Sequence, residues 1–247
     1  ERVAGVDEVG LGCLAGPVVA AAVVLPPNVE LPGLNDSKKL SARKRETLNC
    51  AILAQALSTS IAKVEVQEID QLNILQASLK AMREAIDGLE IVPNHILVDG
   101  HIRPGTSVEE TALVDGDARS MSIAAASVLA KVYRDRLMVE FDETYPEYGF
   151  AGNKGYGSPD HLKALRLHGP SPLHRRTFAP VAQLLVPKNS EAYLTFADGL
   201  EAADSPEELE RMGHFIKEAI GDLTEDDLRA LRGVYRNRLA ALKDMVH

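Results

Sequence analysis

Residues 3–25 read VAGVDEVGLGCLAGPVVAAAVVL and contain two apolar segments separated by a glycine-rich turn. The first segment, Val3–Glu8, and the second, Gly16–Leu25, have the residue types and the bounding glycines of β-strands. Gly16–Leu25 is apolar almost throughout, which is typical of a strand covered on both faces. The stretch therefore predicts a pair of strands inside a sheet that is covered by helices.

The rest of the chain alternates helical and strand patterns and then becomes wholly helical. Ser41 is a favourable N-cap for the helical stretch that follows it. The other expected elements are strands at Ser58–Val66 and Pro93–Asp99 and helices at Gln71–Gly88, Ser120–Tyr145 and Asp160–His168. Beyond Pro187, apolar residues at helical spacing predict two or three amphipathic helices. We expect an α/β domain over residues 1–187 and an α-helical C-terminal extension over 188–247.

Composition narrows the class of protein. Of the 247 residues, 45% are hydrophobic, which is enough for a sizeable core. No apolar run reaches the roughly 20 residues that a membrane-spanning helix needs, and no secretory leader precedes the first strand. Cys13 and Cys50 have no metal-binding spacing, so we expect two free, buried thiols and a reducing cytoplasm.

Charge is distributed unevenly along the chain. The net charge of −9 argues against a general nucleic-acid binder. Asn153–Phe178, however, contains five Lys and Arg and three His against Asp160 alone, whereas residues 188–247 have a net charge of −5. The basic segment is either an ordinary solvated surface or a contact for an anionic ligand.

Acidic residues lie at or near the ends of the expected elements. Asp7 and Glu8 are adjacent in an apolar strand, where a cation, a salt bridge or an exposed strand end would each explain them. Asp99 and Asp117 occur in VDGH and DGDARS. If all four carboxylates converge, their repulsion requires a divalent cation, and oxygen ligands alone favour Mg²⁺ or Mn²⁺. The alternative is that the aspartates belong to ordinary turns and that Asp7 pairs with a lysine.

Five ordered segments resemble the signature motifs of the ribonuclease HII family, also called type 2 ribonuclease H. They are AGVDEVGLGCLAGPVVAAAVVL, LNDSKKLS, ILVDG, GDARSMSIAAASVLAKVYRD and YGFAGNKGYGSPDHLKALRLHGPSPLHRRTF. The resemblance covers about residues 2–185, and the short spacing from Asp99 to Asp117 is similar to that of the bacterial branch.

The resemblance implies a ribonuclease-H-like fold, with a central mixed sheet flanked by helices. It also implies metal-dependent endonucleolytic cleavage of RNA in RNA/DNA hybrids and of duplex DNA with a single embedded ribonucleotide. The products would carry 3′-hydroxyl and 5′-phosphate ends, as in ribonucleotide excision repair and RNA primer removal. The matching metal-binding and catalytic acids are Asp7, Glu8, Asp99 and Asp117, with Mg²⁺ or Mn²⁺ as cofactor. Because alternate strand residues face opposite ways, Asp7 and Glu8 can share a site only at a strand end or bulge.

Other matching positions acquire substrate-binding roles. The expected contacts are Gly10, Leu11, Gly12, Asn35, Ser37, Lys38, Lys39, Tyr156 and Arg176. Tyr156 matches the family tyrosine that stacks on the sugar at the RNA–DNA junction, where the 2′-hydroxyl distinguishes RNA from DNA. LNDSKKLS is alternatively a turn before the helix at Ser41, and Tyr156 is alternatively a packed loop residue. The His and Arg of LHRRTF are interpreted as structural or backbone-contacting groups.

One departure from the family pattern qualifies the resemblance. The family's glycine-arginine-glycine loop is Gly10-Leu11-Gly12 in this chain, so the contact made by the arginine side chain is lost. The alternative function is therefore a hybrid- or junction-binding protein whose cleavage is lost or relaxed. Asp135 is the reserve metal ligand, although Lys131 or an arginine is its expected partner. We expect a monomer, and the extension over 188–247 receives no chemical role.

Overall fold

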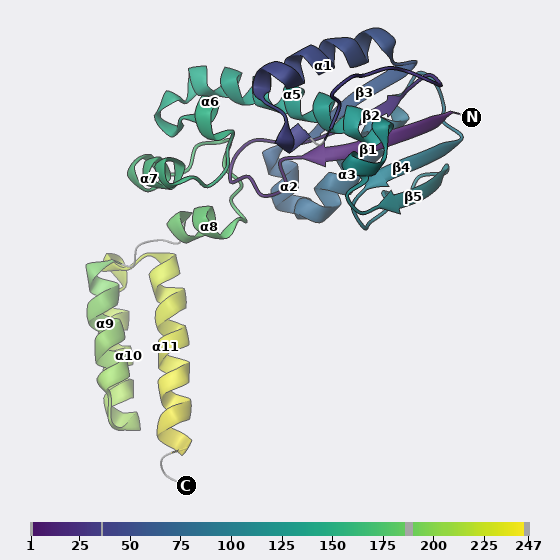
Figure 1. Ribbon diagram of the computed structural model, residues 1–247. Coiled ribbons are helices and arrows are strands. Elements are labelled where there is room, and N and C mark those ends of the chain that lie inside the picture. The colour runs from purple at the N-terminus through teal and green to yellow at the C-terminus, as the bar shows by residue number, and fades with distance from the viewer. Residues whose placement is uncertain (1, 36, 186–189, 245–247) are drawn as a thin grey trace. The chain divides into compact units, whose positions relative to one another are not determined.

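The computed structural model describes residues 2–35, 37–185 and 190–244 (Figure 1). The chain divides into two compact units, residues 1–185 and residues 186–247. The domain boundary that we predict at residue 187 lies among residues 186–189, outside the described residues. Each unit has hydrophobic clusters of its own, and each is described by itself below.

A five-stranded mixed sheet forms the centre of the first unit. Its strands are β1 (Val3–Val9), β2 (Val18–Val24), β3 (Ser58–Val64), β4 (His95–Asp99) and β5 (Glu109–Leu113), in the order β3-β2-β1-β4-β5. β1 and β2 are antiparallel, as are β2 and β3, whereas β4 runs parallel to β1 and β5 runs parallel to β4. All seven residues of β2 are buried, as predicted for a covered strand.

The sequence did not predict β5. Its sequence, EETAL, begins with two glutamates and has no continuous apolar run. β5 lies at the edge of the sheet and pairs only with β4, so most of its side chains remain partly exposed. An edge strand of this kind needs less apolar surface than an interior strand, and its sequence therefore resembles that of a loop.

Helices cover both faces of the sheet (Figure 1). α3 (Ile74–Asp87) packs on the face that includes Ala20 and Ala22, and α1 (Ala42–Gln55) and α5 (Met121–Thr144) pack on the face that includes Ala21. The alanine-rich first half of α5 packs closely against the sheet, as predicted. Gly5 shows how close this contact is, because a Cβ atom at that position would lie 2.1 Å from the backbone carbon of Ser122.

The helix predicted at Gln71–Gly88 corresponds mainly to α3, and a second helix that the sequence did not predict precedes it. α2 (Val66–Leu72) ends at Asn73, which has a left-handed φ of 72°, and α3 begins at the next residue. The Asn73 side chain accepts a hydrogen bond from the Gln76 amide and so caps α3. A positive φ interrupts a helix, and asparagine is a good N-cap, which explains why α2 ends before this residue and α3 begins after it. The preceding strand accordingly ends at Val64 instead of Val66.

Short helices complete the first unit. They are η1 (Ser37–Lys39), α4 (Gly116–Arg119), η2 (Pro146–Tyr148), α6 (Phe150–Asn153), α7 (Pro159–His168) and α8 (Ala179–Leu185). α7 corresponds to the helix predicted at Asp160–His168 and begins one residue earlier, with proline in its first turn. The Ser158 hydroxyl caps α7 by accepting the His161 amide at 3.2 Å.

The second unit is helical, as predicted. It contains α9 (Glu191–Ala202), α10 (Pro206–Glu218), the short η3 (Ile220–Asp222) and α11 (Glu225–Asp244). Leu200, Leu209 and Leu231 belong to one buried cluster that all three longer helices share. Thr224 and Asp227 form the expected capping box, in which each side chain accepts the other residue's amide at 3.1 Å.

Both cysteines are free, but only one is buried. Cys13 is buried, whereas Cys50 on α1 is exposed, which corrects the expectation of two buried thiols. Cys50 lies on the outer face of a helix that buries only one side, and sequence spacing alone does not reveal that face. The cytoplasmic compartment inferred from these thiols stays a prediction. Across the three described segments, no helix combines the length and the apolarity that crossing a membrane requires.

Candidate active site

Asp7, Glu8 and Asp99 lie at one end of the central sheet. β1 and β4 are parallel, and their pairing ends with Val6 opposite Val98. The following residues, Asp7 and Asp99, therefore emerge at the same end of the two neighbouring strands. β1 nevertheless continues to pair with β2 through Asp7, Glu8 and Val9. The acids thus occur where the pairing of β1 with β4 has ended while its pairing with β2 continues.

Asp7 is a buried carboxylate on the face that α5 covers. Its side chain is 6% exposed and forms a hydrogen bond with Ser127 of α5. Burial raises the pKa of Asp7 well above its ordinary value, and the nearby charges of Glu8 and Asp99 raise the pKa further. The hydrogen bond with Ser127 opposes this shift. Asp7 is therefore close enough to both other acids for mutual repulsion.

Glu8 has a buried carboxylate oxygen that lacks a protein partner. Within the described residues, its Oε2 atom forms no hydrogen bond. Burial and the charge of Asp99 raise the pKa of Glu8 to about 7, while Lys38 acts in the opposite direction. A buried, unsatisfied carboxylate oxygen is costly, and a bound cation would satisfy it.

Asp99 connects the strand end to α4. Its Oδ1 atom accepts a hydrogen bond from the Gly116 amide at 2.7 Å. A Cβ atom on Gly116 would lie only 3.1 Å from this oxygen and 2.7 Å from Cδ1 of Ile123, so a larger residue would displace one of these side chains. Asp117 follows immediately, half-buried in the first turn of α4.

The structure thus brings three of the four predicted acids together and places the fourth, Asp117, beside the residue that binds Asp99. Asp7, Glu8 and Asp99 interact electrostatically with one another, and Asp117 is next to the amide that binds Asp99. In the described part of the chain, no group of three or more His, Cys, Asp or Glu side chains is arranged to hold a metal ion. The acids therefore have the oxygen chemistry and the unsatisfied charge that suit a divalent cation, without a closed set of ligands.

Asp135, the reserve ligand, forms ion pairs. Its carboxylate contacts Lys131 at 2.7 Å and Arg45 at 3.4 Å. The predicted pairing of Asp135 with Lys131 or an arginine is therefore confirmed, and the carboxylate in fact contacts both. Two cations already neutralise this carboxylate, so Asp135 lacks the uncompensated charge of Glu8.

The LNDSKKLS segment forms the short helix η1 beside these acids. Asn35, Lys38 and Lys39 are exposed, whereas Ser37 is buried. The Ser37 and Ser127 hydroxyls lie 2.9 Å apart, which links η1 to the serine that binds Asp7. Lys38 and Lys39 are thus exposed, whereas the buried Ser37 connects η1 to Ser127 and, through it, to Asp7.

The loop between β1 and β2 depends on a buried arginine that the sequence analysis did not identify. Arg134 of α5 is fully buried and donates hydrogen bonds to the carbonyls of Ala15, Pro17 and Lys154 at 2.8–3.0 Å. Gly10 has a left-handed φ of 100°, and a Cβ atom there would lie 2.5 Å from Nε of Arg134. The position of Arg134 between Leu129 and Met138, which are also buried, distinguishes it from the exposed charged residues of α5 only in the folded chain.

A second buried arginine contacts the same loop. Arg175 donates two hydrogen bonds to the Gly16 carbonyl and one, at 3.0 Å, to the Leu11 carbonyl. Of the two interpretations of LHRRTF, structural or backbone-contacting, Arg175 therefore has the structural one. The Leu11 side chain is 41% exposed, while its backbone is fixed by this contact. Gly12 has open space around its Cα.

Tyr156 and Arg176 lie on exposed loops of the basic segment. The Tyr156 ring is 42% exposed, and Nζ of Lys131 lies 5.9 Å from its centroid. Arg176 is also exposed, and its amide donates to Asp70 at 2.9 Å, which fixes the backbone of the loop. Both side chains are therefore accessible to a large ligand.

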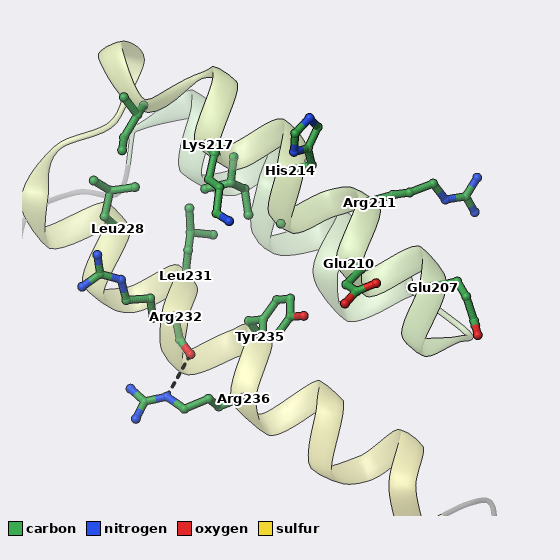
Figure 2. Close-up of a pocket in the computed structure, with 13 residues that line it drawn as sticks. Glu207, Glu210, Arg211, His214, Lys217, Leu228, Leu231, Arg232, Tyr235 and Arg236 are labelled. Carbon is green, nitrogen blue, oxygen red and sulfur yellow. Dashed lines mark hydrogen bonds between the residues drawn. The ribbon is translucent and has the colours of Figure 1, made fainter.

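The second unit has a separate groove of about 1160 Å³ between α10 and α11. Figure 2 shows Leu231, Tyr235 and Lys217 between the two helices, whereas the Arg211 and Arg232 side chains extend away from this space. None of the predicted catalytic or substrate-binding residues lines this groove.

Comparison with known proteins shows which family the first unit resembles. Residues 4–181 match the family model described as Ribonuclease HII. A Ribonuclease HII of Desulfitobacterium hafniense is 56% identical over 184 residues, which cover 74% of this chain and 71% of that protein.

Two solved structures have a similar fold. The ribonuclease H2 of Pyrococcus horikoshii has a TM-score of 0.66 and 28% identity, over 74% of this chain and 97% of that one. The Archaeoglobus fulgidus RNase HII, solved in a complex with PCNA, has a TM-score of 0.62 and 29% identity, over 72% of this chain and 95% of that one. The fold and the acids at the strand ends are consistent with these similarities. The chain belongs to the ribonuclease HII family and is a ribonuclease H endonuclease.

Proposed function

We propose that the protein uses a divalent metal ion to cut RNA in RNA/DNA hybrids and single ribonucleotides embedded in duplex DNA. The products would have 3′-hydroxyl and 5′-phosphate ends. The observation that carries the metal dependence is the unsatisfied Oε2 atom of Glu8 among mutually repelling carboxylates. A site built in this way is stable in its ionised form only when a cation is present.

Asp7, Glu8, Asp99 and Asp117 would hold the metal. When bound, Mg²⁺ or Mn²⁺ supplies an activated water and stabilises the leaving oxygen of the phosphodiester. The protein's own contribution is positioning. Ser127 orients Asp7, and the Gly116 amide orients Asp99, so that two of the carboxylates are fixed before a ligand arrives. Preorganised charge of this kind is an efficient source of catalysis.

The substrate would contact the exposed groups around the acids. Asn35, Lys38, Lys39 and Arg176 would contact phosphates, which positions the duplex without reading its sequence. The backbone of Gly10, Leu11 and Gly12 would approach the 2′-hydroxyl, and the Tyr156 ring would stack on the sugar at the junction. These contacts would direct cleavage to the ribonucleotide, in keeping with removal of misincorporated ribonucleotides and RNA primers.

A cleavage assay tests this function directly. The purified chain is incubated with a duplex that carries one ribonucleotide, in Mg²⁺, in Mn²⁺ and in EDTA, and an all-DNA duplex is the control. We expect cleavage only of the ribonucleotide-containing duplex, only with metal, and with 5′-phosphate ends. Binding of the duplex without cleavage in either metal would instead favour the alternative of a junction-binding protein, which the loss of the arginine at Leu11 motivates.

Metal binding has a readout that is independent of activity. Because the ionised acids repel one another, Mg²⁺ or Mn²⁺ should raise the thermal unfolding midpoint of the free protein. The rise should be larger at pH 8 than at pH 5.5, because the pKa of Glu8 lies near 7 and its carboxylate is mostly protonated at the lower pH. Equal shifts at both pH values would argue against binding at these acids.

A further inference from the structure

Two buried histidines lie outside the acidic site and take no part in the proposed chemistry. His161 on α7 is 0% exposed and His174 is 1% exposed, and their Nε2 atoms lie 3.0 Å apart. The aromatic rings of Tyr148 and Phe150 pack around them. Polar rings are buried in such a setting only if their hydrogen bonds are satisfied.

The partners of the two rings determine where the protons are. The Tyr156 carbonyl can only accept, so Nδ1 of His161, 2.8 Å away, must carry a hydrogen and donate it. The Ser171 amide can only donate, so Nδ1 of His174, at 3.0 Å, must accept. His174 therefore carries its hydrogen on Nε2 and donates it to the bare Nε2 atom of His161.

The hydrogen bonds consequently run in one direction, from Ser171 through His174 and His161 to Tyr156. Both rings are neutral in this arrangement, because a proton on Nε2 of His161 would face the Nε2 hydrogen of His174, and Nδ1 of His174 already accepts the Ser171 amide. In agreement with this requirement, burial lowers the pKa of His174 to about 4 and also lowers the pKa of His161. We call this chain of hydrogen bonds, from Ser171 through His174 and His161 to Tyr156, the relay. Only one pair of histidine tautomers satisfies it.

The relay connects two loops of the proposed substrate site. His174 forms an isolated β-bridge with Ala15 in the loop between β1 and β2. At the other end, the Tyr156 carbonyl accepts both His161 and the Ser158 amide, so both of its lone pairs are used. The exposed Tyr156 ring extends from the residue that carries this doubly bonded carbonyl. The Tyr156 amide also donates to the Asn153 carbonyl at 3.0 Å, and the side chain contacts Lys131 and Cys13.

We propose that His161 and His174 are positioning residues that fix the Tyr156 backbone, and with it the ring that contacts the ribonucleotide. This inference rests on the proposed function of Tyr156. A merely structural role for the pair would stabilise the fold without a particular effect on the ribonucleotide junction. The positioning role requires the effect to pass through Tyr156.

Two substitutions at one position separate these roles. In His161→Gln, the amide lies near the former Nε2 position, so it can meet His174 but no longer reaches the Tyr156 carbonyl. In His161→Asn, the amide lies near the former Nδ1 position, so it can still donate to Tyr156. We expect kcat/KM on the single-ribonucleotide duplex to fall at least fivefold in His161→Gln and to recover most of that loss in His161→Asn. His168→Gln removes an exposed histidine from the same helix and should change kcat/KM less than twofold.

A second pair of measurements tests the route of the effect. In a Tyr156→Ala background, His161→Gln should change kcat/KM less than twofold, because the ring that it positions is already absent. If His161→Gln does not fold, His174→Gln replaces it in both backgrounds. That variant keeps a donor toward His161 but loses the Ser171 contact, and it should lower kcat/KM at least twofold with Tyr156 present and not with Tyr156→Ala.

Four outcomes would overturn the inference. Equal losses in His161→Gln and His161→Asn, or an undiminished loss in the Tyr156→Ala background, would show a general structural role. If Tyr156→Ala impairs cleavage and His161→Gln does not, the relay fails while the proposed function of Tyr156 stands. If Tyr156→Ala has no effect on cleavage, the proposed role of Tyr156 fails, and the relay has no ring to position.

Discussion

At the scale of single residues, Asp99 has the strongest structural link to the proposed chemistry. It ends β4, accepts the Gly116 amide and repels both acids of β1. Asp99→Asn removes one negative charge and keeps the shape of the side chain. We expect cleavage to fall at least ~10²-fold, which is the scale of removing a key electrostatic group.

The matched measurements for Asp99→Asn are the fold and the metal response. Circular dichroism should be unchanged, because an asparagine oxygen can still accept the Gly116 amide. The thermal shift on adding Mg²⁺ should shrink. Near-normal cleavage at saturating Mg²⁺ would remove Asp99 from the site.

Leu11 occupies the position where the family motif has arginine. Its backbone is fixed by Arg175 and its side chain is exposed, so a longer side chain fits there without displacing the loop. If no other cation replaces the lost contact, Leu11→Arg should stabilise the transition state on the single-ribonucleotide duplex by roughly 1 to 2 kcal/mol. This corresponds to a rise in kcat/KM of about fivefold to thirtyfold.

The salt dependence of kcat/KM shows whether any gain in Leu11→Arg comes from a phosphate contact. A new phosphate contact should lose part of its benefit as the salt concentration rises. A flat or lower kcat/KM at low salt would show that another cation already serves this phosphate or that the loop has repacked around leucine. Lys38, Lys39 and Arg176 are the candidate substitutes, since all three are exposed.

His174 gives the protein a defined dependence of stability on pH. Its pKa is about 4 in the folded chain and about 6.5 when unfolded, so folding favours the neutral ring. The corresponding stability is complete above pH 6.5 and is lost as the pH falls toward 4, by about 3 kcal/mol in all. Urea unfolding at several pH values should show a smaller loss in His174→Gln. Asp7 and Glu8, whose pKa values are raised, act in the opposite direction in both proteins and cancel in the difference.

At the scale of elements, α5 combines packing with the construction of the site. Its alanines allow close contact with the sheet, Ser127 orients Asp7, and Arg134 contacts the loop that holds Gly10. Arg134→Leu would leave three buried carbonyls without this donor. We expect the free energy of unfolding to fall by about 3 kcal/mol or more.

Arg136 is the matched control on the same helix. Its exposed guanidinium contacts Glu46, and such surface pairs contribute little. Arg136→Leu should therefore change the free energy of unfolding by less than about 1 kcal/mol in the same urea titration. Equal effects of the two substitutions would contradict the role assigned to the buried arginine.

At the scale of the whole molecule, the two units have separate cores and different charge. The basic segment Asn153–Phe178 belongs to the first unit, whereas residues 188–247 carry a net charge of −5. An acidic unit is poorly suited to bind phosphates. Deleting residues 188–247 should therefore change the Kd for the single-ribonucleotide duplex by no more than a few fold, as measured by fluorescence anisotropy without metal.

Gel filtration and circular dichroism of the truncated protein are the controls for this deletion. The hydrophobic clusters of the first unit contain only residues of that unit, so the truncated protein should stay folded. A large loss of affinity from a well-folded truncation would show that the extension contacts the substrate or orders the site.

The sequence by itself determined the local features of this protein. It predicted four of the five strands, the long helix that becomes α5, the helical extension with its capping box, and the resemblance to ribonuclease HII. These features depend on residue patterns a few positions apart, which propensity, capping and periodicity describe well. The edge strand β5 and the break at Asn73 escaped prediction because their local patterns are ambiguous.

Only the tertiary structure decided which distant residues meet. The parallel register of β1 and β4 places Asp7 beside Asp99, and the fold buries Ser37 against Ser127 and Arg134 beneath the loop of Gly10. These contacts join residues some 90 to 125 positions apart in the chain, and their energies depend on burial and on the direction of each hydrogen bond. Burial and direction are properties of the packed molecule, because the same side chains are solvated and unpaired in the unfolded chain.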